Sequence, residues 1–327
     1  MAPPRTSTST RTEGLEATFT PSAISGDGRV VVGEAFDSDV TSLVGASWSE
    51  SGGIAELPPL SDASARTAGI AANCDGSVLL ARDASRGDIY RVEAGRAQQV
   101  LGDSPRLATL SMNADGSAVI DGTGPATEVD GSVVAVPQRW SAPSGAVPLT
   151  AVSNASLHRV ALDGSFIGSN ADALFRYRPQ TRQRERIGFA PLNGEGALVV
   201  NRAGTAWIES DDERQRSFVV WRTEADPISV SCPGVCRLKA LSGDGQVALI
   251  DLVDGTAVHS ALWTERGGFI DLAEQLRRGG FDVGQLTLRA SAMSDDARAF
   301  AGTTYDAEEH AQPSSFFYAV LPADADG

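Results

Sequence analysis

A four-residue turn that recurs seven times constrains the fold of this chain more than any other feature of its sequence. Each copy stands between two apolar runs, has an acidic third residue and, in six copies, ends in glycine. Ser or Asn at the first position hydrogen-bonds to the backbone two residues on, and Gly adopts the left-handed conformation that ends a tight hairpin. Each copy therefore predicts a β-hairpin. The copies span residues 25–28, 73–76, 113–116, 161–164, 193–196, 242–245 and 294–297.

The spacing of these turns predicts the architecture. Their last residues, at positions 28, 76, 116, 164, 196, 245 and 297, are 48, 40, 48, 32, 49 and 52 residues apart. These intervals are close to the length of one four-stranded propeller blade. The pattern predicts an all-β fold, a single seven-bladed antiparallel β-propeller. Six or eight blades are the alternatives, because the 32-residue interval is short for a complete blade.

A second repeated feature, an aromatic residue followed by a polar turn and a short apolar run, comes after each hairpin. It indicates that every unit contains two hairpins, and we expect the aromatic rings to pack between neighbouring blades. The aromatic residues are Trp48, Tyr90, Trp140, Tyr177, Trp221, Trp263 and Phe317.

The first and last units suggest how the ring closes. The chain enters at the first strand of a unit, residues 22–25, and leaves after a third strand, residues 315–322. We expect residues 1–12 to be a flexible tether, residues 13–322 to form the propeller with an N-terminal strand completing the last blade, and residues 323–327 to be a flexible tail. One short helix is predicted within 271–280, where Leu272 and Leu276 have helical spacing before a Gly-Gly pair.

Charge and hydropathy limit the partners. The chain has 27 basic and 42 acidic residues, a formal net charge of -15, which repels nucleic acid and anionic lipid. No apolar run is long enough to span a membrane, and the opening 14 residues contain no apolar signal core. The opening is rich in Thr, Ser and Pro, like the tether that follows a removed signal or lipid anchor. We therefore expect an extracellular or cell-envelope location and a monomer.

The three cysteines leave more than one interpretation open. Cys232 and Cys236 flank a Pro-Gly turn, so a loop-closing disulfide is favoured over two free thiols. A metal site needs more ligands, and the histidines, at positions 158, 259 and 310, are far apart in the sequence. Cys74 is expected to be a small buried apolar residue. We expect no cofactor.

No catalytic motif is present. The chain lacks GxSxG, a phosphate-binding loop and a calcium loop of the EF-hand type. The repeated turn residues Asp27, Asp75, Asp115, Asp163 and Asp244 are interpreted as turn formers, because equivalent positions of different blades are distributed around the ring. The arginine-rich segment 176–186 is expected to be a solvated outer hairpin.

Several segments resemble the repeats of the HAF-repeat family of bacterial extracellular proteins. They are residues 22–36, 239–252, 261–272 and 281–306, together with 315–322, and the resemblance covers most of residues 20–321. It departs from the pattern in the fourth and fifth units, where RYRPQTRQRERI replaces the Trp-and-Gly hairpin. The resemblance implies export and a propeller-like repeat fold, and it supplies no catalytic residues.

Loop length indicates which face of a propeller disc binds. The four-residue turns are short and uniform, whereas the connections at 121–138, 201–217 and 303–315 are long and divergent. We expect a non-catalytic exported binding or scaffolding module that recognises a glycan, a peptide or a partner protein through these loops. The alternative is a propeller glycoside hydrolase or lyase with carboxylates near the central pore. Candidate ligand-binding residues are Trp207, Asp211, Asp212, Tyr305, Glu308, Glu309 and His310.

Overall fold

The computed structural model describes residues 19–322 except 38–41, 61–65, 103–109, 122–125, 130–131, 153–154, 190–197, 211–213, 224, 256, 285 and 306–314. The tether predicted at 1–12, the closing segment at 13–18 and the tail at 323–327 lie outside these residues.

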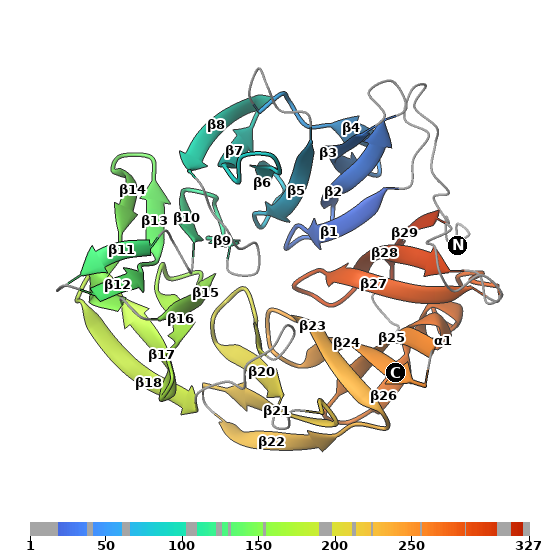
Figure 1. The fold of residues 1–327 in the computed structure, drawn as a ribbon. Coiled ribbons are helices and arrows are strands. Elements are labelled where there is room, and N and C mark those ends of the chain that lie inside the picture. Colours follow the sequence, from blue (N-terminus) through green and yellow to red (C-terminus); the bar gives the residue numbers. More distant parts are fainter. Residues whose placement is uncertain are drawn as a thin grey trace.

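Seven small antiparallel sheets form a ring, which confirms the seven-bladed β-propeller and excludes six or eight blades (Figure 1). Blades 1 and 2 each contain four strands in chain order. In blade 1 these are β1 (Thr20–Ile24), β2 (Val30–Asp37), β3 (Ser42–Ser49) and β4 (Gly53–Glu56). In blade 2 they are β5 (Thr67–Ala72), β6 (Val78–Asp83), β7 (Ile89–Glu93) and β8 (Arg96–Leu101).

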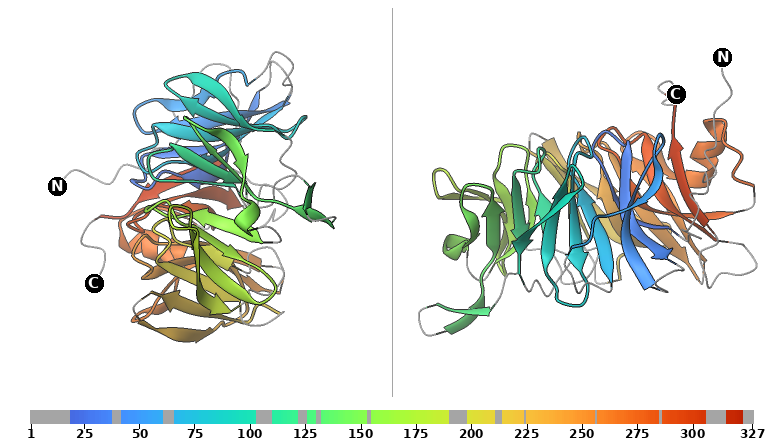
Figure 2. Two further views of the ribbon diagram at one scale, coloured as in Figure 1. Left: turned by 90° about the vertical axis from the view of Figure 1, so that its left-hand side faces the viewer. Right: turned by 90° about the horizontal axis from the view of Figure 1, so that it is seen from above.

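Blade 3 differs because a separate hairpin, β11 (Ala126–Val129) and β12 (Ser132–Ala135), is inserted between its second and third strands. This hairpin projects from the disc (Figure 2). The blade itself consists of β9 (Leu110–Met112), β10 (Ala118–Asp121), β13 (Gln138–Ser141) and β14 (Gly145–Pro148). A single 3-10 turn, η2 (Thr150–Val152), leads into blade 4.

The remaining blades follow the same order. Blade 4 contains β15 (Ser156–Val160), β16 (Phe166–Ser169), β17 (Ala173–Arg178) and β18 (Gln183–Phe189). Blade 5 contains β19 (Leu198–Val200), β20 (Ala206–Ser210), β21 (Ser217–Arg222) and β22 (Ala225–Ser231). Blade 6 contains β23 (Val235–Leu241), β24 (Val247–Asp254), β25 (Ala257–Thr264) and β26 (Gly268–Asp271). Blade 7 has three strands among the described residues, β27 (Thr287–Met293), β28 (Ala299–Tyr305) and β29 (Ser315–Val320).

The repeated turns use the predicted residue types, but the side chain of the first residue accepts from the backbone N–H five residues on, not two. In the first turn, the Ser25 hydroxyl accepts from the Val30 backbone N–H at 3.0 Å and donates to Asp27 Oδ1 at 2.6 Å. Gly28 has a φ of 76°, in the left-handed region that glycine favours. The turn at 294–297 ends instead in Ala297, with a φ of 56°. The turn at 161–164 begins with Ala161, and there Asp163 Oδ1 accepts from the N–H and the hydroxyl of Ser165 instead.

One predicted turn is in the wrong place. The fifth inner hairpin, between β19 and β20, turns at 201–204, where Gly204 has a φ of 70°. The predicted copy at 193–196 lies outside the described residues. Asn201 keeps the turn chemistry, because its Oδ1 accepts from Thr205 and Ala206 N–H groups at 2.9 and 3.0 Å. The prediction searched for an acidic third residue, and the observed turn has Ala203 at that position, so the segment 193–196 was chosen instead.

The aromatic residues lie in the third strand of each blade, as predicted. Trp48, Trp140, Trp221 and Trp263 pair with residues that stand three positions after the turn glycine. Contacts across blades follow, and the Trp263 ring lies 5.6 Å from that of Phe218 in an edge-to-face arrangement. Packing between neighbouring blades is therefore their role.

A β-bulge that the sequence did not reveal recurs in five first strands. The bulged residue stands three positions before the turn in each case, and the pairing register shifts there. In the second strand opposite, a Cβ atom at Gly302 would be 2.1 Å from the Arg289 carbonyl oxygen, so glycine is required. The bulged residues are Ser22, Ile70, His158, Lys239 and Ser291.

The first and last blades contact each other directly. The Tyr318 hydroxyl donates to the Gly28 carbonyl at 2.8 Å, and the Ser291 hydroxyl donates to that of Pro21 at 2.7 Å. Phe19, 1% exposed, packs edge-on against Phe316 with ring centroids 4.9 Å apart. These contacts hold the ring together between its two ends.

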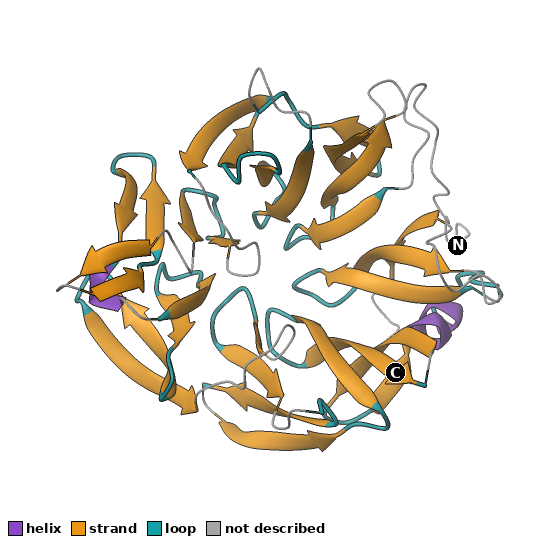
Figure 3. Cartoon of the chain, in the orientation of Figure 1, coloured by secondary structure: helices purple, strands orange, loops and turns teal. Residues whose placement is uncertain are grey.

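The predicted helix and disulfide are both present. Helix α1 (Leu272–Arg278) begins after Asp271, whose carboxylate accepts from the Glu274 N–H at 3.0 Å, and lies at the rim of the disc (Figure 3). Cys232 and Cys236 form a disulfide. Cys74 is a free thiol that is only half-buried, not the fully buried residue expected, and burial raises its pKa. Among the described residues, no helix is long and apolar enough to cross a membrane.

Candidate functional site

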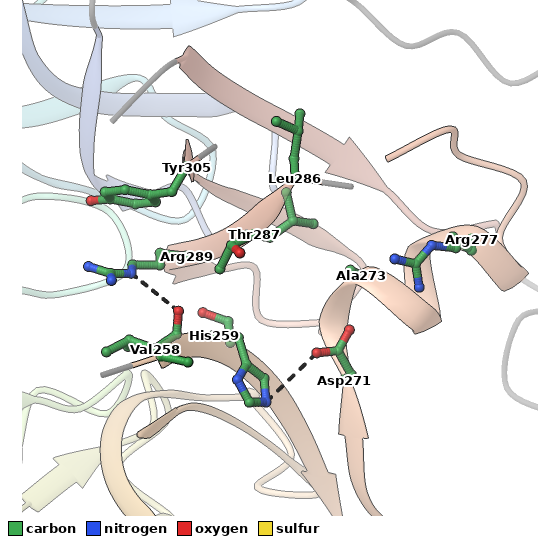
Figure 4. A pocket seen from close by; sticks show the side chains of 12 residues that line it. Val258, His259, Asp271, Ala273, Arg277, Leu286, Thr287, Arg289 and Tyr305 are labelled. Atoms are coloured by element: carbon green, nitrogen blue, oxygen red, sulfur yellow. Dashed lines mark hydrogen bonds and ion pairs between the residues drawn. The ribbon is translucent and has the colours of Figure 1, made fainter. Parts of the chain in front are cut away.

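A cavity of about 250 Å³ lies between blades 6 and 7 (Figure 4). Its walls come from the beginning of β25, the end of β26, helix α1, the beginning of β27 and the end of β28. The strands of a blade alternate in direction, so these ends lie on the side of the disc opposite the four-residue turns. We call the two sides the turn face, which holds the seven turns, and the cavity face.

One wall of the cavity is an arginine stacked on a tyrosine. The guanidinium carbon of Arg289 lies 4.2 Å from the centre of the Tyr305 ring, within the range of a cation–π contact. The Arg289 Nε donates to the Val258 carbonyl at 3.4 Å. Register explains the pairing: Thr287 lies opposite Tyr305 across β27 and β28, and Arg289 is two residues further on the same face. Arg289 forms no ion pair with any residue that the structure describes.

The opposite wall carries a histidine and a carboxylate. His259 Nε2 lies 3.8 Å from Asp271 Oδ2, and Figure 4 shows both side chains at the lower edge of the cavity. Asp271 also caps helix α1 through Oδ1, which fixes its orientation. Arg277 from the last turn of α1 reaches the same space and is 3.3 Å from Glu274. Asp271 and Arg277 therefore reach the cavity from one wall, and Arg289 reaches it from the other.

Ser260, at the bottom of the cavity, is a structural residue. Its hydroxyl donates to Asp251 Oδ1 at 2.7 Å and accepts from the Ala290 N–H at 2.9 Å, which ties blade 6 to blade 7. Both bonding functions of this hydroxyl are occupied. The polar side chains that remain for a ligand are those of Arg289, Tyr305, His259, Asp271, Arg277 and Thr287.

The structure treats the predicted binding residues differently. Tyr305 lies in the cavity wall, on the cavity face. Trp207 was placed in a loop, and this is wrong: it belongs to β20, is 3% exposed, and stacks on Trp221 with ring centres 6.1 Å apart. Its ring fills the core because it occupies the second-strand position opposite the third-strand aromatic. Four acidic residues and one histidine lie outside the described residues, namely Asp211, Asp212, Glu308, Glu309 and His310.

Sequence reasoning missed three polar residues of the cavity, Arg289, His259 and Asp271. They belong to β27, β25 and β26, and no spacing rule connects them. Only the packing of blade 7 against blade 6 brings them together.

The turn face is built as a scaffold. Backbone hydrogen bonds connect successive turns around the axis: Asp27 N–H to the Cys74 carbonyl at 2.8 Å, Asp295 N–H to Gly26 at 2.9 Å, and Gly243 N–H to Asp295 at 2.8 Å. Asp75 accepts from the Ser77 hydroxyl at 2.6 Å and its N–H at 3.0 Å, and these bonds lower the pKa of its carboxyl group. Such carboxylates serve the turn, as the sequence predicted.

Arg202 extends across the axis at this face. Its guanidinium donates to the carbonyls of Ala72 at 2.9 Å and Ile24 at 3.2 Å and pairs with Asp295 Oδ1 at 3.1 Å. One side chain of blade 5 thereby joins blades 2, 1 and 7. Among the described residues no group of three or more His, Cys, Asp or Glu side chains is arranged to hold a metal ion.

Fold and site together define a seven-bladed β-propeller with a cavity between two blades on the cavity face. The sequence matches no protein-family model, and no curated protein is similar in sequence. Many solved structures share the fold, and two serve as examples. TolB from Acinetobacter baumannii is 12% identical with a TM-score of 0.51, and the match covers 75% of this chain and 63% of TolB. A streptogramin B lyase is 11% identical with a TM-score of 0.51, over 89% of this chain and 92% of the lyase. At these identities the likeness shows the fold alone.

Proposed function

We propose that this chain is a non-catalytic binding module that recognises a glycan, a peptide or a partner protein on the cavity face. The observation that carries the proposal is the cavity itself, where a stacked Arg289–Tyr305 pair faces a His259–Asp271 pair. A concave, partly apolar space with a few convergent polar groups is typical of ligand sites. On the turn face, backbone groups of neighbouring turns are occupied in hydrogen bonds to one another.

We also propose that the chain is exported and belongs to the HAF-repeat family. The Cys232–Cys236 disulfide supports export, because disulfides persist in oxidising compartments. The recurrence of the same turn, with a third-strand tryptophan in blades 1, 3, 5 and 6, supports the repeat assignment.

The alternative is a propeller enzyme, a glycoside hydrolase or lyase with carboxylates near the axis. Such chemistry needs a positioned acid and base. Near the axis, the carboxylate of Asp295 is engaged by Arg202. This engagement favours the binding module.

A glycan and peptide binding screen tests the proposal with two matched variants. Ala257→Trp places a large side chain at an exposed position in the cavity wall. Leu162→Trp adds a tryptophan on the turn face, where Leu162 is 51% exposed. We expect a ligand of the wild-type chain to be lost with Ala257→Trp and retained with Leu162→Trp. The reverse result would place binding on the turn face, and a change in ligand mass after incubation would establish the enzyme.

A further inference from the structure

We propose that the ligand of the cavity is an acidic sugar, a single uronate unit whose carboxylate pairs with Arg289. This inference rests on the proposed function, and it adds the chemical class of the ligand and the residue that selects it.

Several arginines of the protein face carboxylates of described residues, and Arg289 is not among them. Arg91, Arg178 and Arg222 each have a glutamate within 2.7 to 2.9 Å. Arg289 has no acidic partner among the described residues, although the chain contains 42 acidic and 27 basic residues. Its Nε is used by the Val258 carbonyl and one face of its plane is covered by Tyr305. The remaining N–H groups form the fork that binds a carboxylate with two parallel hydrogen bonds.

The neighbouring wall offers an acceptor for hydroxyl groups on the same ligand. Asp271 Oδ2 faces His259, and its carboxylate accepts hydrogen bonds but donates none. A uronate presents a carboxylate on one side of its ring and hydroxyl donors on the others. An Asp or Glu side chain of a peptide would satisfy Arg289, but it has no hydroxyl beside its carboxylate, so a donor for Asp271 would have to come from another part of the peptide. The volume of about 250 Å³ also suits one ring-sized group.

The net charge of the protein favours a short ligand over a long acidic polymer. The formal charge of -15 disfavours a densely charged polymer approaching from a distance. At physiological ionic strength, screening limits this repulsion to about 8 Å, so the local field of Arg289 and Arg277 governs a ligand already in the cavity. A short oligosaccharide with one engaged uronate meets both conditions.

The test uses titration calorimetry of the full chain at physiological ionic strength. The probes are galacturonate and glucuronate di- and trisaccharides, their neutral galactose and glucose counterparts, and an acidic peptide of equal charge. We expect an acidic oligosaccharide to bind the wild-type chain. Arg289→Gln should lower its affinity at least tenfold, and Arg289→Lys should lower the affinity less. The control is Arg184→Gln, because the Arg184 guanidinium lies 3.9 Å from the Phe175 ring in blade 4, a matched stacked arginine outside the cavity. Arg184→Gln should leave affinity unchanged.

Each other outcome is decisive. Equal loss with Arg184→Gln would indicate bulk electrostatics and overturn the uronate site. Suppose that a neutral sugar or the peptide binds, that Ala257→Trp abolishes this binding, and that Arg289→Gln does not change its affinity. This result would overturn the uronate assignment and leave the proposed function intact. If none of the sugars or peptides bound in a cavity-dependent way, the uronate assignment would be wrong and the binding function would lose its support. Thermal unfolding of every variant verifies that it is folded.

Discussion

Arg202 and Asp295 are 93 residues apart in the chain, yet Arg202 Nε lies 3.1 Å from Asp295 Oδ1 at the axis of the propeller. The same guanidinium reaches backbone carbonyls of blades 1 and 2. Four of the seven blades therefore meet at one side chain, which is largely buried.

Removing this contact should destabilise the ring. Arg202→Met leaves a carboxylate and two carbonyl groups without their partner, and we expect a loss of about 2 to 4 kcal/mol in the free energy of unfolding. Denaturant unfolding measures it. Arg29→Met is the control, because the Arg29 side chain is 84% exposed and its loss should cost less than about 0.5 kcal/mol. Equal effects of the two substitutions would show that the axial contact contributes nothing specific.

The turn at 294–297 offers a test of backbone strain. Ala297 has a φ of 56°, so Ala297→Gly should be neutral or stabilising by up to about 1 kcal/mol, with the greater unfolded-state entropy of glycine offsetting part of the gain. Gly28→Ala makes the opposite change, and its Cβ would lie 2.6 Å from that of Ala299. It should therefore destabilise by more than about 1 kcal/mol. Clear destabilisation by Ala297→Gly would contradict the argument.

Ring closure by the N-terminal segment stays a prediction, since residues 13–18 lie outside the described residues. Deleting residues 1–18 preserves Phe19 and β1, and we expect the melting temperature to fall by several degrees or more, because the last blade would keep an open edge. Differential scanning calorimetry is the measurement. Deleting residues 1–12 alone should change little, and an unaltered melting temperature after the longer deletion would argue against closure by this strand.

His158 makes stability depend on pH. Burial lowers its pKa from 6.5 to about 4, and its Nε2 lies 2.8 Å from the Ser169 hydroxyl. Because the folded pKa is below the unfolded value, the unfolded state binds more protons between these values. The contribution of neutral His158 to the free energy of unfolding is complete above about pH 6.5, and it is lost as the pH falls toward 4. We expect His158→Gln to flatten this part of the stability curve by about 2 kcal/mol, as followed by urea unfolding at pH 4.5 and 7.5. A variant curve parallel to that of the wild type would refute this.

The sequence by itself determined the hairpins, the number of blades, the third-strand aromatics, the helix after Asp271 and the favoured disulfide. All of these depend on residues close together in the chain: Ser25, Asp27 and Gly28 close their turn through bonds within five residues. Turn chemistry of this kind is local, so a linear pattern reveals it. The displaced fifth turn shows the limit, because Asn201 and Gly204 satisfy the geometry without the acidic residue that marked the other copies.

Only the tertiary structure decided where a ligand has room. The predicted turn at 193–196 put Trp207 in the connection 201–217, but the turn lies at 201–204, so Trp207 belongs to β20 and pairing with Trp221 buries it. His259, Asp271, Arg289 and Tyr305 become neighbours because two blades pack face to face and leave a cavity between strand ends. Arg202 reaches Asp295 for the same reason, since closing the ring brings the turns of distant blades to one axis. Such contacts depend on packing between units, and no residue spacing within a unit encodes them.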